Sequence, residues 1–177
     1  MTTIDDSSRS TEASRRIGSA LVLLAFLAIA AAVAVLGSLA TTAQVDGWYA
    51  EADKAPWTPP NAVFGPVWTV LYTLMSVAAW LVWRERRRAQ VGPALGWYVG
   101  QLVLNSVWTP LFFALYPSVG SAALWLAFAV IVLLDVAVLV TVVQFWRVRR
   151  AAAVLLVPYL AWILYASSLN LYAALNN

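Results

Sequence analysis

Five long apolar segments, separated by short polar and basic stretches, constrain the fold of this chain more than any other feature. Each segment holds about 20 mostly apolar residues, which is the length of helix that crosses the hydrocarbon core of a bilayer. Inside a membrane the backbone must be hydrogen-bonded within the protein, and helices achieve this. The pattern therefore predicts an all-α integral membrane protein with five transmembrane helices in a single bundle. The expected helices occupy about residues 17–40, 62–83, 94–114, 121–145 and 152–173.

The segments between and before these helices differ in composition. Residues 1–16 are rich in Ser, Thr and charge, and this composition predicts a disordered N-terminal tail, which leaves residues 17–177 as the membrane domain. Residues 41–61 contain four charged residues and three prolines, which predict a structured loop outside the membrane. Residues 116–120 contain Pro and Gly, and they predict a turn between two helices.

Composition excludes several classes of protein. The chain is 63% hydrophobic and 11% charged, whereas soluble domains are about half apolar and about a quarter charged. It contains no Cys and no His, so we expect no disulfide, no metal site and no Ser-His catalysis. The basic residues lie beside the apolar segments, and we therefore expect a lipid bilayer, and no nucleic acid, as the surroundings of the chain.

The distribution of basic residues predicts an orientation. Ten of the eleven Lys and Arg residues fall in residues 1–16, 84–88 and 147–150, and one falls in residues 41–61. Cytoplasmic connections carry an excess of basic residues. The N-terminus is therefore expected in the cytoplasm, and the C-terminus and the first loop outside. Helices rich in Ala and Val favour a bacterial inner membrane.

Six of the ten tryptophans fall into two groups. Trp83, Trp97 and Trp146 lie at helix ends or beside basic residues, as interfacial anchors do. Others lie within the expected helices, on stripes that combine aromatic and amide side chains at helical spacing. Such stripes suit a pocket for a flat, apolar ligand with a few polar edges. The stripes consist of Phe64, Trp68, Tyr72 and Met75; of Gln101, Asn105, Trp108 and Phe112; and of Trp162, Ala166, Leu169 and Asn170.

Two polar features inside the membrane each have two interpretations. The amides of Gln101 and Asn105 either line this pocket or hydrogen-bond to neighbouring helices. Asp135 is the only acidic residue within an expected span, toward the end of its helix. It either has a specific role or simply reaches water.

Small residues on the third expected helix have two interpretations as well. Gly92, Gly96 and Gly100 recur every four residues, a spacing that lets another helix approach closely. Their face lies on the side of the helix away from Asn105. It forms either a contact inside the bundle or the interface of a homodimer.

Four linked motifs resemble the TspO/MBR family of tryptophan-rich membrane proteins. The first loop matches the family's W-Y-x-x-x-x-K-x-x-W-x-P-P at residues 48–60. The helices match F-x-P-V-W-x-x-L-Y-x-x-M at residues 64–75, G-Q-L-x-L-N-x-x-W-x-P-x-F-F at 100–113 and P-Y-L-x-W-x-x-x-A-x-x-L-N at 158–170. The resemblance covers about residues 20–175 in the same order.

This resemblance implies a five-helix bundle whose first loop is a lid over a cavity that binds porphyrins and benzodiazepine-type ligands. Trp68 and Trp162 align with tryptophans implicated in light-dependent porphyrin breakdown in some bacterial members. The sterol motif of animal members ends in a basic residue after the fifth helix, and no such residue is present here. The expected ligand site, lid included, consists of Trp48, Tyr49, Trp57, Pro59, Phe64, Trp68, Tyr72, Gln101, Asn105, Trp108, Trp162, Ala166 and Asn170.

We therefore expect a homodimeric membrane sensor or regulator that binds a tetrapyrrole, with porphyrin as its ligand or substrate and no intrinsic cofactor. One alternative is a light-dependent enzyme in which Trp68 or Trp162 donates an electron to the excited porphyrin. The other is a transporter of porphyrins or other small apolar ligands, with Pro66 and Pro110 as hinges. The sequence favours binding, because it shows neither a hydrolytic constellation nor a chain of intramembrane charges.

Overall fold

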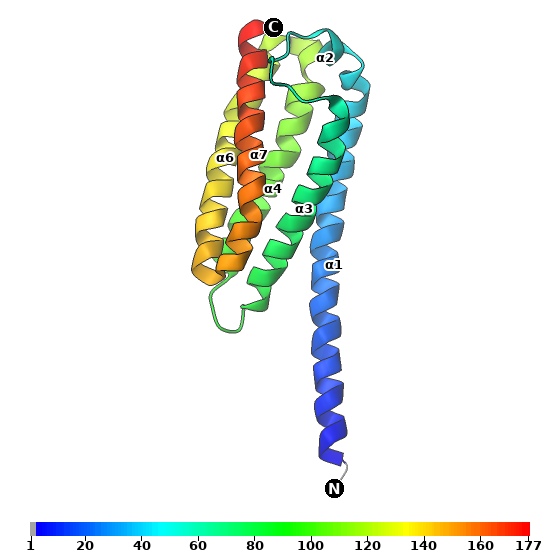
Figure 1. The fold of residues 1–177 in the computed structure, drawn as a ribbon, viewed down its shortest axis with the longest axis vertical. Helices are drawn as coiled ribbons and strands as arrows, with labels where there is room; N and C mark the ends of the chain where they lie inside the picture. Colours follow the sequence, from blue (N-terminus) through cyan, green and yellow to red (C-terminus); the bar gives the residue numbers. More distant parts are fainter. Residues whose placement is uncertain (1–2) are drawn as a thin grey trace.

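The computed structural model describes the backbone of residues 3–177, and the side chains of residue 12 and of residues 14–177. In this part of the chain all regular structure is α-helical. The long helices are α1 (Thr3–Val45), α3 (Asn61–Arg84), α4 (Gly92–Phe113), α6 (Ser121–Val148) and α7 (Arg150–Asn176). Two single turns connect them, α2 (Trp48–Glu51) and α5 (Tyr116–Val119). Figure 1 shows the long helices side by side, with the N-terminal part of α1 reaching beyond the others.

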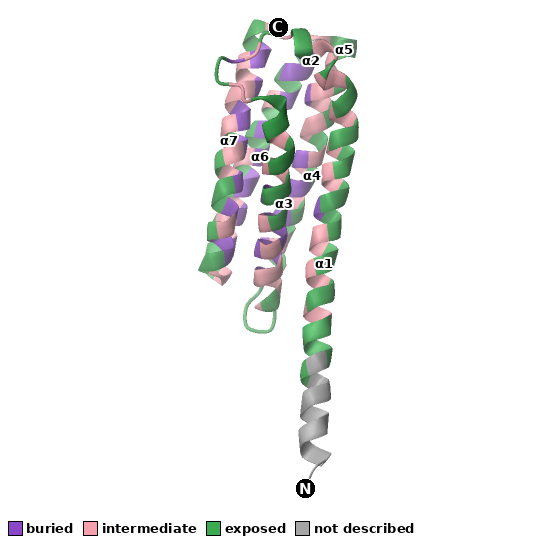
Figure 2. Cartoon of the chain, turned by 45° about the vertical axis from the view of Figure 1, so that its right-hand side comes forward, coloured by how far each residue is buried: buried purple, intermediate pink, exposed green. Residues whose placement is uncertain are grey.

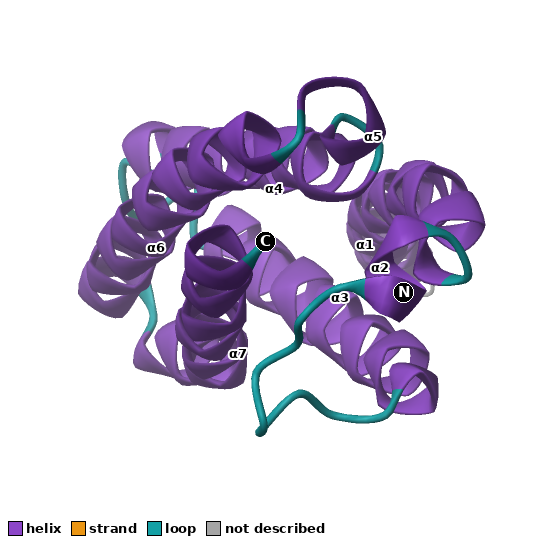
Figure 3. Cartoon of the chain, turned by 90° about the horizontal axis from the view of Figure 1, so that it is seen from above, coloured by secondary structure: helices purple, strands orange, loops and turns teal. Residues whose placement is uncertain are grey.

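The five long helices close into a ring. α1 packs on α3 and α4, α4 packs on α6, α6 on α7, and α7 on α3, an arrangement that Figure 3 shows from above. Buried residues lie mainly on the inner faces of α3, α4, α6 and α7, whereas α1 is mostly exposed or partly buried (Figure 2). The exposed side chains of α1 include Leu21, Leu24, Leu36 and Leu39. Apolar surface of this extent marks a protein that lies in a membrane.

Four helical segments are long and apolar enough to span a membrane, namely Ser14–Val45, Asn61–Arg84, Ser121–Val148 and Arg150–Asn176. The 22 residues of α4 correspond to about 33 Å at 1.5 Å per residue, which is also a spanning length. α4 carries the amides of Gln101 and Asn105, and both of these are buried within the bundle. Helices of this composition make the chain an integral membrane protein.

The first helix is longer than the sequence pattern predicts. α1 begins at Thr3, so its backbone is helical across most of the predicted disordered tail, and it continues to Val45, into the predicted loop 41–61. The hydroxyls of Thr41 and Thr42 each donate to a carbonyl one turn earlier at 2.7 Å. Polar residues at its ends are therefore compatible with the helix. The polar residues mark the limits of the apolar part of α1, and the helix continues beyond those limits at both ends.

The two ends of the bundle carry different connections. The first loop (residues 46–60, including α2), α5 and the C-terminus lie at one end (Figures 1 and 2). The predicted turn at residues 116–120 contains the short helix α5 and closes at Gly120. Its φ of 63° lies in the left-handed region that glycine adopts easily. The α3–α4 connection and the α6–α7 junction lie at the opposite end (Figure 1).

Candidate functional site

Three buried polar side chains join α3, α4 and α7 in the interior of the bundle. The Tyr72 hydroxyl donates to Asn105 Oδ1 at 2.8 Å, and Asn105 Nδ2 donates to the Tyr159 hydroxyl at 3.2 Å. All three residues are buried, so neither water nor lipid competes for these bonds. Asn105 therefore connects three helices. Of the two interpretations of this amide, a pocket lining or a hydrogen bond between helices, the structure shows the second.

Aromatic side chains continue this cluster toward the end that carries the first loop. Trp68 stacks on Tyr72 with ring centroids 5.2 Å apart and meets Tyr159 edge-on at 6.2 Å. Trp162 meets Phe64 edge-on at 5.8 Å. Phe64, Trp68 and Trp162 are only partly buried, whereas the two tyrosines are buried. The rings that a ligand can still cover are therefore those of α3 and α7 nearest the first loop.

A second polar pair joins α4, α6 and α7 at the same end. The Trp108 indole donates to Asn170 Oδ1 at 3.0 Å, and Asn170 Nδ2 donates to the Leu124 carbonyl at 3.0 Å. Trp108 also stacks on Phe112 at 5.5 Å. Asn170 and the nearby Ala166 are buried. The Asn170 amide thus serves helix packing in this structure.

The embedded half of the first loop (residues 46–52) packs into the bundle. The Trp48 indole donates to the Phe113 carbonyl at 2.8 Å and stacks on Tyr116 at 3.9 Å. Tyr49 is 8% exposed and meets Phe113 edge-on at 5.3 Å. Burial raises the pKa of the Tyr49 phenol, and the nearby Tyr165 phenol adds to the shift. These contacts fix the path of the chain as it leaves α1.

The surface half of the first loop (residues 53–60, which include the partly buried Pro59) is fastened to α7 mainly by hydrogen bonds. The Tyr165 hydroxyl donates to the Trp57 carbonyl at 2.6 Å, and the Trp57 indole donates to Ser168 Oγ at 3.2 Å. Asn177 accepts from the Asp53 N–H at 2.9 Å and donates to the Asp53 carbonyl at 3.1 Å. Trp57 itself is 50% exposed. Within the same half, Ala55 is buried and the Trp57 ring meets Tyr172 edge-on at 5.6 Å.

Gln101 lies one turn from Asn105 but does not join its network. It is 1% exposed, and neither of its amide atoms has a hydrogen-bond partner within the described part of the chain. Asp135 accepts at Oδ2 from the Ser167 hydroxyl at 2.7 Å, and its Oδ1 has no partner there. The expectation that Asp135 lies toward the end of its helix is wrong. α6 continues to Val148, and this places Asp135 near its middle.

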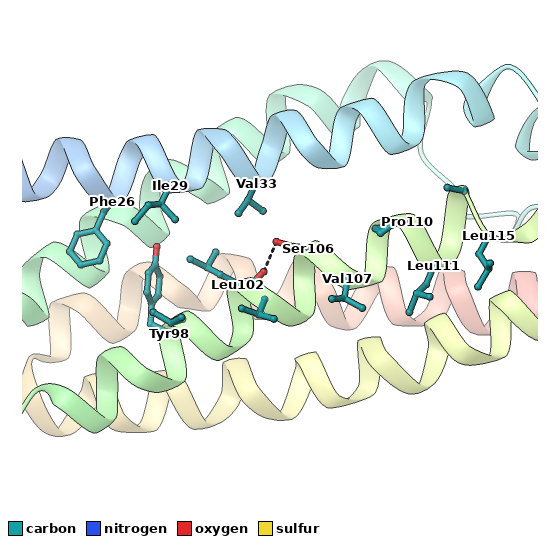
Figure 4. A pocket seen from close by; sticks show the side chains of 13 residues that line it. Phe26, Ile29, Val33, Tyr98, Leu102, Ser106, Val107, Pro110, Leu111 and Leu115 are labelled. Carbon is teal, nitrogen blue, oxygen red and sulfur yellow. Dashed lines mark hydrogen bonds between the residues drawn. The ribbon is translucent and has the colours of Figure 1, made fainter.

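A cavity of about 700 Å³ lies between α1 and α4, and none of the predicted site residues lines it. Figure 4 shows Phe26 and Val33 of α1 facing Tyr98, Leu102 and Ser106 of α4. The Ser106 hydroxyl donates to the Leu102 carbonyl at 2.8 Å. Apolar side chains of this kind occur on every lipid-facing helix. The sequence therefore carries no signal that would have identified this cavity.

The chain is similar in sequence to known proteins. The sequence profile of the TspO/MBR family matches residues 25–175. The chain belongs to the TspO/MBR family. The tryptophan-rich protein TspO of Archaeoglobus fulgidus is 37% identical over 89% of this chain and 97% of that protein. The tryptophan-rich sensory protein of Cereibacter sphaeroides is 38% identical over 86% and 89%, and the Homo sapiens translocator protein is 40% identical over 70% of each chain.

The match to the TspO/MBR family contains every predicted site residue, from the first loop to α7. It begins within α1, so the N-terminal part of this helix lies outside the matched range. The aromatic stripes, the amides and the loop tryptophans of this TspO/MBR protein therefore all lie within the part of the chain that defines its family.

The glycine stripe on α4 of this TspO/MBR protein faces outward. A Cβ added at Gly92, Gly96 or Gly100 meets nothing within 4 Å, whereas one added at Gly37 lies 3.7 Å from the Thr109 side chain. The stripe therefore does not pack against another helix of the same chain, which was one of its two interpretations. The face stays open to a second copy, and the homodimer stays a prediction.

Proposed function

We propose that this TspO/MBR protein is a membrane sensor or regulator that binds a tetrapyrrole, such as a porphyrin, beneath the first loop. The names of its relatives, tryptophan-rich sensory protein and translocator protein, support a sensing or translocating role. In this proposal all five long helices, α4 included, cross the bilayer, and the first loop is the lid. The basic residues support a cytoplasmic N-terminus with the lid outside, and the helices rich in Ala and Val support a bacterial inner membrane.

The observation that carries the proposal is the partial burial of three aromatic rings at the lid end. Phe64, Trp68 and Trp162 lie on α3 and α7 next to buried tyrosines, yet they keep exposed surface. A flat ligand that stacks on such rings gains about 0.5–1.5 kcal/mol per aromatic pair beyond its buried area. Lys54 is the only basic residue of the lid, and its Nζ lies 5.1 Å from the Tyr49 ring centroid. It offers an ion pair to a carboxylate edge of the ligand.

The α1–α4 cavity suits a tetrapyrrole less well. Its lining is apolar except for the hydroxyls of Tyr98 and Ser106, and it contains no basic residue. The carboxylates of a tetrapyrrole would lose water there without gaining a partner, and that is strongly unfavourable. The charge of the ligand therefore favours the lid end over the apolar α1–α4 cavity.

Titration of the purified protein with protoporphyrin tests the proposal. Binding is expected to quench the tryptophan fluorescence saturably, because indoles line the site. Trp162→Phe should raise Kd about threefold, since a smaller ring loses about 0.5–1 kcal/mol of stacking and contact. Trp146→Phe is the matched control at the opposite end and should leave Kd unchanged. Absence of saturable quenching in the wild type, or equal losses in both variants, refutes the proposal.

One contact favours light-dependent porphyrin breakdown, with molecular oxygen as the oxidant, as a second candidate function. Trp68 stacks on Tyr72 at 5.2 Å, so an indole radical left after electron donation to the excited porphyrin has a phenol close enough to reduce it. Illumination of the complex in air tests this candidate. A defined product that depends on Trp68, and is lost in Trp68→Phe, supports an enzyme, whereas unspecific bleaching in both proteins excludes one.

A further inference from the structure

Seven arginines gather at the end of the bundle opposite the lid. They come from the α3–α4 connection and from the α6–α7 junction, which Figure 1 shows at the same end. Glu85 is the only acidic residue in these two connections. We call this surface the basic end, and it consists of Arg84, Glu85, Arg86, Arg87, Arg88, Arg147, Arg149 and Arg150.

An ion pair ties the two connections of the basic end together. Arg149 donates to Glu85 Oε1 at 2.9 Å, and both side chains are partly exposed. The bond brings α3–α4 residues and α6–α7 residues, which lie more than 60 positions apart in the sequence, into one surface. The bond also neutralises Glu85, the single acid of the basic end. Seven arginines and one glutamate give this surface a net charge of +6.

Tryptophans hold three of these arginines at the level of the membrane surface. Trp favours the headgroup region of a bilayer, and a guanidinium placed over its ring is held there by cation–π attraction. The guanidinium carbons lie 3.3 to 5.4 Å from the ring centroids, in the pairs Arg86–Trp83, Arg84–Trp80 and Arg150–Trp146. We therefore expect these charged groups to be held at headgroup depth before any ligand arrives.

We propose that the basic end binds the headgroups of anionic phospholipids in the surrounding leaflet. A guanidinium pairs with phosphate through parallel N–H···O bonds, and a group that is already ordered loses less entropy on binding. Basic clusters directly beside a membrane helix attract anionic lipids. The lid end carries three acids and one base, so it does not compete for them. The depth of the Arg–Trp pairs favours a lipid headgroup over free phosphate as the source of the anion.

The exposed Arg87 and Arg88 give the proposal a measurable magnitude. A basic residue near an anionic membrane surface contributes about fivefold in binding, the equivalent of about 1 kcal/mol. The double variant Arg87→Gln/Arg88→Gln should therefore bind an anionic lipid about 25-fold more weakly. Added salt should weaken binding to the wild type as well, because exposed charges are screened.

The experiment titrates the full-length protein in detergent with short-chain phosphatidylglycerol, and separately with phosphatidylcholine of the same chain length. The readout is the midpoint of thermal unfolding, which rises when a ligand binds the folded state. We expect phosphatidylglycerol to raise it more than phosphatidylcholine does, and the double variant to need about 25-fold more lipid for the same rise. Lys54→Gln, which removes the one basic residue of the lid, should show the same lipid-induced rise as the wild type, because this readout does not depend on porphyrin binding.

Three outcomes overturn the proposal. Equal stabilisation by the two lipids would show that acyl chains, and not headgroup charge, are bound. A weakening of about fivefold by Lys54→Gln, which is the effect expected for one lost charge, would show that net charge alone matters. Full stabilisation by inorganic phosphate would show a free-anion site. The double variant is compared through the shift that the lipid produces, so a change in its own stability does not obscure the result.

Discussion

Replacing Asn105 by leucine removes the side chain that joins three helices, and the matched change at Gln101 removes one without a hydrogen-bond partner among the described residues. Asn105 is 2% exposed and Gln101 1% exposed, so the two substitutions alter equally buried positions one turn apart on α4. Asn105 bonds to neighbouring helices through Tyr72 and Tyr159, whereas Gln101 has no such bond within residues 14–177. We expect Asn105→Leu to destabilise the protein and Gln101→Leu to leave it unchanged or more stable.

The expected magnitude follows from the two bonds of Asn105. A side-chain hydrogen bond within a membrane contributes about 0.6 kcal/mol on average and up to about 1.7 kcal/mol. Asn105→Leu also leaves the Tyr72 hydroxyl as a buried donor without an acceptor, which costs about 1–3 kcal/mol. The free energy of unfolding should therefore fall by about 2–4 kcal/mol. Gln101→Leu removes two unpaired polar atoms, and the free energy should stay equal or rise by about 1 kcal/mol.

Equilibrium unfolding in mixed micelles of a mild detergent and dodecyl sulfate, followed by circular dichroism, measures both changes. The pair controls for the altered apolarity of α4, because each variant exchanges one amide for leucine. Equal losses in the two variants would refute the reasoning, since the bonds of Asn105 would then contribute nothing specific. An unchanged stability of Asn105→Leu would refute it as well.

Two further predictions concern the lid and the glycine stripe. Tyr165→Phe removes the hydroxyl bound to the Trp57 carbonyl, so amide exchange in the surface half of the lid should accelerate about fivefold, for about 1 kcal/mol. Exchange mass spectrometry checks this, and equal acceleration in the embedded half contradicts it. Gly96→Leu should abolish the proposed homodimer in light scattering without destabilising the monomer. Gly37→Leu should destabilise the monomer, because Thr109 lies against that position. A persistent Gly96→Leu dimer contradicts the interface.

Most helix limits could be predicted because the residues that end the apolar segments also end the helices. The predicted helix 62–83 is observed as Asn61–Arg84. It ends at Arg84, the first residue of the basic run in the α3–α4 connection. The predicted helix 121–145 starts at Ser121, directly after Gly120, as expected. α1 could not be predicted in this way, because its polar ends remain helical. Apolarity indicates where a membrane lies, and a helix can extend past it.

The partners of the site residues could not be predicted. Helical spacing correctly placed Gln101 and Asn105 on a buried face, but the two amides look alike in sequence. Only Asn105 meets hydroxyls, and these lie 33 and 54 positions away in the chain. The α1–α4 cavity depends on how closely two helices approach, which side-chain periodicity does not encode. Contacts between residues far apart in the sequence were thus the part of the site that only the structure could show.

A structure of the protein with protoporphyrin bound tests the central proposal most directly. We predict that the ring lies against Trp68 and Trp162, beneath the surface half of the lid, with a carboxylate near Lys54. The α1–α4 cavity should then be free of porphyrin. Porphyrin bound in that cavity, with both tryptophans uncovered, would contradict the proposal.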